Sequence, residues 1–119
     1  MSNWVANAAL AAVTGDIPIA EKLAAEGSKL RLKGAIWSVG CTAASSGGAL
    51  GACHLQFGNS SGNLSTIIVG FGSSLTAPIR HSIQDSEGIL SARCIRATFG
   101  TGSSVAGPLA VVIWGDFDE

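Results

Sequence analysis

The feature that most constrains the fold is a regular alternation between apolar runs of strand length and clusters of Gly, Ser, Thr and Asn. It runs from about Lys29 to the end of the chain and is typical of antiparallel strands joined by turns. No helical pattern intervenes between these runs, which favours an antiparallel β-sandwich or jelly roll over an α/β fold. We therefore predict a mainly all-β protein with a β-sandwich or jelly-roll domain over residues 28–119.

Two runs carry a clear strand pattern. Residues 29–39 place Leu30, Leu32 and Ile36 on one face and basic side chains on the other. We therefore expect one face of this strand to be exposed to solvent at its start. Residues 109–117 are apolar on both faces. We expect this last strand to lie centrally in a sheet, because an apolar strand at a free edge invites aggregation.

A third run contains Ile67, Ile68 and Val69 in succession. Consecutive β-branched residues predict a strand that is covered on both faces, either inside the sandwich or by another subunit. Residues of this run and of the last strand form the candidate core or interface set. Its members are Ile67, Ile68, Val69, Val111, Val112, Ile113 and Trp114.

Residues 1–27 differ in composition and hydrophobic pattern from the rest of the chain. They are rich in alanine, turn near Pro18, and then place Ile19 and Leu23 at helical spacing. Two interpretations remain open. The segment is either a short helix, which the composition of residues 19–25 favours, or an extended arm that reaches across a neighbouring subunit before the domain begins.

The composition is 47% hydrophobic and only 13% charged, against about 25% charged residues in an average soluble domain. So few charges cannot cover the surface of a typical monomer, and an oligomer is expected. The net charge of -1 argues against a nucleic-acid partner. No apolar run approaches the roughly 20 residues of a membrane-spanning helix, and no secretory pattern opens the chain, so we expect retention in a cytoplasm.

No catalytic, cofactor or metal site is predicted, and the protein is not expected to be an enzyme. The three cysteines are odd in number and lack CxxC spacing, which favours buried thiols. Antiparallel pairing could bring His54 and His81 together, but no third metal ligand stands at a suitable spacing. The serines lack a GxSxG context, and the glycine-rich pieces lack the lysine of a phosphate loop.

With weakly charged strands at 29–39, 64–72 and 109–117 around Gly, Ser and Thr loops, the chain resembles the small jelly-roll or β-sandwich virion structural proteins of bacteriophages and other viruses. The resemblance implies a capsid, vertex, decoration or spike/fibre subunit located in the virion and assembled in the host cytoplasm. It implies self-assembly as trimers or pentamers and contacts with other virion proteins. No site residue is carried over from that class.

The alternative function is a carbohydrate-binding module on the same architecture. The ligand surface would then combine an aromatic platform, Trp37, with the polar residues His54, Asn59 and Asn63, and the partner would be a host-surface glycan. Trp37 falls on the polar face of its strand in this interpretation. The structural interpretation is that Trp37 and Trp114 anchor contacts in the core or between subunits.

Overall fold

A computed structural model of the chain describes residues 3–10, 19–39, 53–60, 62–70, 79–99 and 109–118. All of the regular structure in these ranges is β-strand. The strands are β1 (Asn3–Leu10), β2 (Ala20–Leu23), β3 (Lys29–Val39), β4 (Cys53–Ser60), β5 (Asn63–Gly70), β6 (Ile79–Gln84), β7 (Leu90–Ala92), β8 (Cys94–Phe99) and β9 (Leu109–Asp118).

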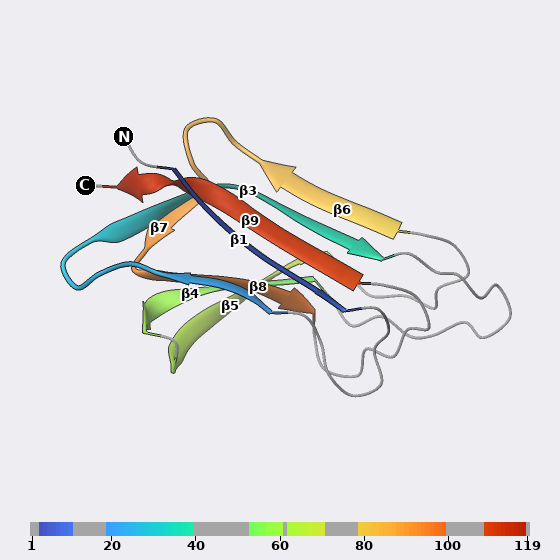
Figure 1. Cartoon of the computed structure of the whole chain (residues 1–119), viewed down its shortest axis with the longest axis horizontal. Helices are drawn as coiled ribbons and strands as arrows, with labels where there is room; N and C mark the ends of the chain where they lie inside the picture. The colour runs from blue at the N-terminus through green and yellow to red at the C-terminus, as the bar shows by residue number, and fades with distance from the viewer. Residues whose placement is uncertain are drawn as a thin grey trace, which may run out of the picture.

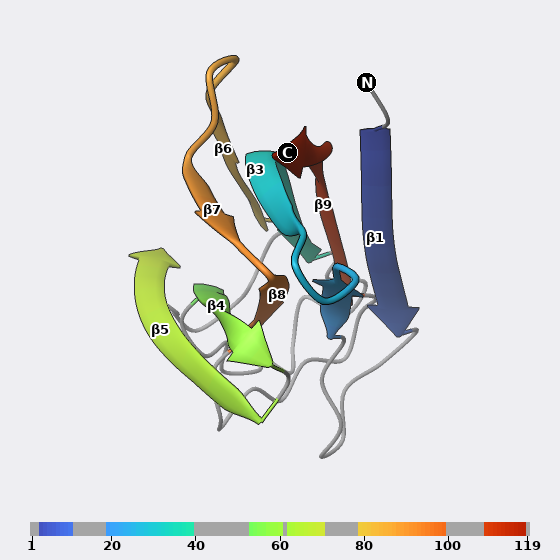
Figure 2. The same ribbon diagram turned by 90° about the vertical axis from the view of Figure 1, so that its left-hand side faces the viewer.

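The strands form two stacked antiparallel sheets (Figures 1 and 2). The first sheet has the order β1-β9-β3-β6, with β7 also pairing with β3, and the second sheet has the order β2-β8-β4-β5. The chain thus winds as successive antiparallel pairs, β1 with β9, β2 with β8, β3 with β6 and β4 with β5. This is the strand order of a jelly roll, and the predicted fold class is confirmed.

The core lies between the two sheets and is built from alternate residues of the paired strands. As the sequence indicated, β9 lies centrally in its sheet, between β1 and β3. The largest fully buried side chains are Trp37, Phe99, Leu30, Leu32, Leu55, Ile95, Leu109, Ile113, Val111 and Cys94. Burial of these residues is the main source of folding free energy, since each large apolar side chain contributes roughly 1.5–3 kcal/mol.

A register shift within β3 changes which residues face the core. The pairing of β3 with β9 shifts between Leu32 and Gly34, so one extra residue enters the strand there. Leu32 points inward before the shift and Trp37 points inward after it, each 1% exposed or less. Ile36 consequently lies on the outer face, and its predicted place beside Leu32 is wrong.

The predicted helix over residues 19–25 is also wrong, because Ala20–Leu23 is strand β2. Ala20 is buried opposite Ala97, whereas Ile19 and Leu23 are 49% and 45% exposed. Pairing with β8 has overridden a weak local preference for helix. Strand β1 pairs with β9 along its whole length, so it is part of the first sheet.

Candidate functional site

The outer face of the first sheet carries an apolar surface across β1, β9 and β3. The register aligns Val5 with Trp114, Asn7 with Val112, and Ala9 with Ala110, and the next strand continues the middle row with Ile36. We call this surface the outer stripe. It consists of Val5, Ala9, Ile36, Ala110, Val112 and Trp114.

Exposure is what distinguishes the outer stripe from the core beneath it. Val5 is 60% exposed, the largest value among the described large hydrophobic residues. Ile36, Val112 and Trp114 are half-buried, although strand neighbours flank them on both sides. No charged side chain lies in the rows of β1, β9 and β3 that form the stripe. The second sheet lies on the opposite side and cannot cover it (Figure 2).

Gly34 explains how Trp114 lies against the sheet. A Cβ atom at Gly34 would stand 2.0 Å from Cζ2 of Trp114, so the indole occupies the space where a side chain would be. A glycine inside a strand often marks such a close approach. The indole also borders a hollow of about 440 Å³, lined by Asn3, Trp4, Val5, Lys33, Trp114 and Gly115.

A second hollow follows along the same face. Its volume is about 270 Å³, and its lining residues are Asn7, Ala8, Ala9, Ile36, Ser38, Ala110, Val111 and Val112. Side chains of a partner, or a small ligand, could fit into these two hollows of the outer stripe.

An ion pair lies at one end of the outer stripe. The Nζ atom of Lys33 lies 2.9 Å from Oδ2 of Asp116, whose side chain is only 9% exposed. The indole Nε1 of Trp4 donates a hydrogen bond to the backbone oxygen of Asp116 at 2.9 Å. Because the buried carboxylate has a cationic partner, the charge at this end is compensated within the chain.

The outer face of the second sheet is more polar. Arg96 Nε donates a hydrogen bond to Glu21 Oε1 at 2.8 Å, and Gln56 Nε2 donates to Thr66 Oγ1 at 3.1 Å. His54 lies on the same face in the neighbouring row, opposite Thr98 of β8 and Ile68 of β5. The outer face of the second sheet therefore carries hydrogen-bonded polar groups at its centre, whereas the outer stripe of the first sheet consists of apolar side chains.

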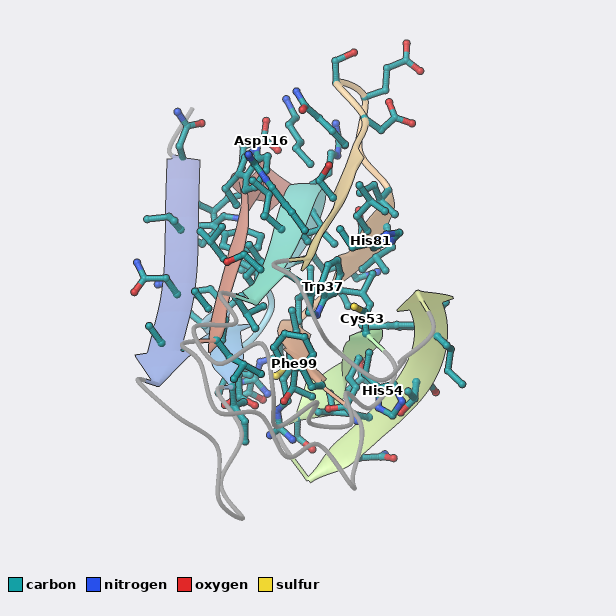
Figure 3. All side chains as sticks on the ribbon, turned by 90° about the vertical axis from the view of Figure 1, so that its right-hand side faces the viewer. Trp37, Cys53, His54, His81, Phe99 and Asp116 are labelled. Carbon is teal, nitrogen blue, oxygen red and sulfur yellow. The ribbon has the colours of Figure 1, made fainter. Side chains whose placement is uncertain are left out.

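The residues expected to form a carbohydrate surface are not brought together. Trp37 is 1% exposed and donates a hydrogen bond from Nε1 to the backbone oxygen of Thr98 at 2.9 Å. Its place between the sheets (Figure 3) excludes the predicted role as an exposed platform. Asn59 and Asn63 are exposed where β4 turns into β5, and His54 is on the outer side of β4.

The two histidines also lie apart. His54 belongs to the second sheet, whereas His81 belongs to β6 of the first sheet, where its ring centroid is 6.0 Å from that of Trp37 (Figure 3). Among the described residues, no group of three or more His, Cys, Asp or Glu side chains is arranged to hold a metal ion.

Burial raises the pKa of the Cys53 thiol to about 11, which keeps the thiol protonated at neutral pH.

The candidate core or interface set divides into three groups. Val111 and Ile113 are core residues, 1% and 0% exposed. Val112 and Trp114 belong to the outer stripe. Ile67 and Ile68 lie on β5 and are 43% and 54% exposed, so the interior interpretation of their strand is wrong. The side chain of Val69 lies outside the described residues.

The sequence reasoning missed Val5 and Ile36 as members of the outer stripe, and it missed Lys33 as the charged residue at the end of the stripe. Val5 could be placed only once β1 was known to pair with β9, and the shift in β3 reversed the expected direction of Ile36. Gly34, a glycine within a strand pattern, was the one available signal, because it marks a bulge or a close approach.

Within the described ranges, no helix has the length and hydrophobicity needed to cross a membrane. A scan of family models found none that matches the chain, and a search of curated proteins found no relative.

Proposed function

We propose that the chain is a virion structural protein, a capsid, vertex, decoration or spike/fibre subunit that packs against copies of itself and against other virion proteins. It would assemble in the host cytoplasm, as trimers or pentamers, and reside in the virion. The jelly-roll strand order supports this proposal, because capsid shells use it. Lectins and cupins use the same order, so the fold alone does not decide between functions.

The observation that carries the proposal is the outer stripe. A soluble monomer seldom leaves three uncharged rows of a sheet face open with a valine that is 60% exposed. Strands β1 and β9 present this face along most of their length, and the hollows beside Trp114 and Val112 offer places for side chains of a partner. A second copy that covered the stripe would bury apolar surface without desolvating any charge of the stripe itself.

The test is the oligomeric state of the purified protein, measured by analytical ultracentrifugation. Val5→Glu places a charge on the stripe at an exposed position and should raise the dissociation constant at least about tenfold, or ~1.4 kcal/mol. Leu23→Glu is the matched control, because Leu23 is 45% exposed on the second sheet. A wild-type monomer at every concentration would overturn the proposal, and so would equal effects of the two variants.

A carbohydrate-binding module remains the second candidate, and one observation favours it. The indole of Trp114 borders the larger hollow together with Asn3 and Lys33, which combines an aromatic surface with polar groups. A host-surface glycan would occupy this hollow in place of a second copy. Glycan-array binding that Trp114→Ala abolishes while Trp114→Phe retains it would support this function, and the absence of binding by the wild-type protein would reject it.

A further inference from the structure

Strand β5 is an edge strand of the second sheet, and it lacks the features that usually prevent an edge strand from pairing with another chain. It pairs with β4 on one side, and no described strand pairs with its other side. Its sequence, NLSTIIVG, contains no charge and no proline over 8 residues. Ile67 and Ile68 are 43% and 54% exposed on it. Such an edge presents unpaired backbone groups and apolar side chains to another strand.

The opposite edge of the same sheet provides the contrast. Strand β2 has only 4 residues, AEKL, and two of them, Glu21 and Lys22, are charged. Lys22 stands opposite the buried Ile95, so a charge sits on the inward side of this edge. Short length and charge are the devices by which proteins prevent pairing at an edge. β2 has both of them, and β5 has neither.

Neither edge strand of the first sheet calls for a partner strand as β5 does. β6 carries Arg80 and His81. β1, like β5, has no charge and no proline over 8 residues, but its exposed Val5 lies in the outer stripe already assigned to self-association.

We propose that β5 of one copy pairs antiparallel with β5 of a second copy about a two-fold axis, which joins the two second sheets into one continuous sheet. The partner must be an extended strand, because the exposed groups are backbone donors and acceptors. A second β5 fits because antiparallel self-pairing opposes no like charges in this sequence. The inference rests on the proposed self-assembly for its partner but concerns a different surface.

The side-chain pattern of β5 selects a register. Leu64, Thr66 and Ile68 share the outer face, since they stand opposite the outward residues of β4. An axis through Thr66 places the two Thr66 residues opposite each other and Leu64 opposite Ile68 of the second copy. Threonine pairs and apolar pairs at such positions stabilise a sheet. This register also keeps the first sheets of both copies on the same side.

Disulfide trapping tests the register directly. Of the three cysteines, Cys53 and Cys94 are buried, and Cys41 lies outside the described residues and is replaced by serine in this experiment. In that Cys41→Ser background, Thr66→Cys should form a covalent dimer under mild oxidation, because directly opposed strand residues lie within the Cα separation of a disulfide. Leu23→Cys is the matched control, on the same outer face but at the charged edge, and should not cross-link. Equal cross-linking of the two variants, or none by Thr66→Cys, overturns the inference.

A charge variant supplies the second readout. Ile68→Lys should raise the dissociation constant of the β5 contact at least tenfold and abolish cross-linking through Thr66→Cys, whereas Leu23→Lys should change neither. Circular dichroism verifies that both variants fold, and the trapping result does not depend on them. If Val5→Glu dissociates the assembly but Thr66→Cys does not cross-link, the proposed function stands and this inference fails. The reverse pattern supports β5 pairing and rejects the outer stripe as an interface.

Discussion

Substitution of Gly34 by alanine should drive Trp114 off the first sheet. The new Cβ atom would stand 2.0 Å from Cζ2 and 2.4 Å from Cε2 of the indole, far inside van der Waals contact, so the ring must rotate outward. Overpacking of this kind costs about 1–3 kcal/mol. Replacing a glycine also lowers the conformational entropy of the unfolded chain, which raises the unfolding free energy by roughly 0.4–1 kcal/mol. We expect Gly34→Ala to lower the unfolding free energy by about 1–2 kcal/mol on balance.

The assay is a double-mutant cycle followed by chemical denaturation. In a Trp114→Ala background the clash is absent, and Gly34→Ala should be neutral or stabilise the protein by up to about 1 kcal/mol. Fluorescence should also show a more solvent-exposed indole in the single variant. Gly62→Ala is a control for the general effect of a glycine replacement, since its Cβ would meet nothing within 4 Å. Equal destabilisation by Gly34→Ala in both backgrounds would refute the packing described for Trp114.

Three further outcomes are expected. Ile113→Asp should abolish folding, as judged by circular dichroism, because it buries an unpaired carboxylate at a cost of several kcal/mol, whereas Val112→Asp on the outer face should fold. Trp37→Phe should destabilise the protein by about 1–3 kcal/mol in denaturant titrations, since it removes the hydrogen bond to the backbone oxygen of Thr98; an unchanged midpoint would contradict that role. The raised pKa of Cys53, about 11 against an ordinary 9.0, means that the folded state holds this proton more tightly. The unfolding free energy should therefore fall between about pH 9 and pH 11, and Cys53→Ala should lack that part of the slope.

The sequence determined the fold class and the central place of the last strand. Its alternation of apolar runs and turn residues has the period of strands, and the length of 119 residues allows one core. A strand apolar on both faces, such as residues 109–117, needs neighbours on both sides. Burial of Val111 and Ile113 with outward placement of Val112 and Trp114 follows from the same two-residue period.

Only the tertiary structure decided the directions of Ile36 and Trp37, because the shift at Gly34 adds one residue and reverses every side chain beyond it. It also decided that Ala20–Leu23 is a strand, since pairing with β8 outweighs local propensity. Exposure of Ile67 and Ile68 follows from the place of β5 at a sheet edge. Local sequence fixes which residues alternate, but long-range pairing fixes which face is covered and which edge is left open.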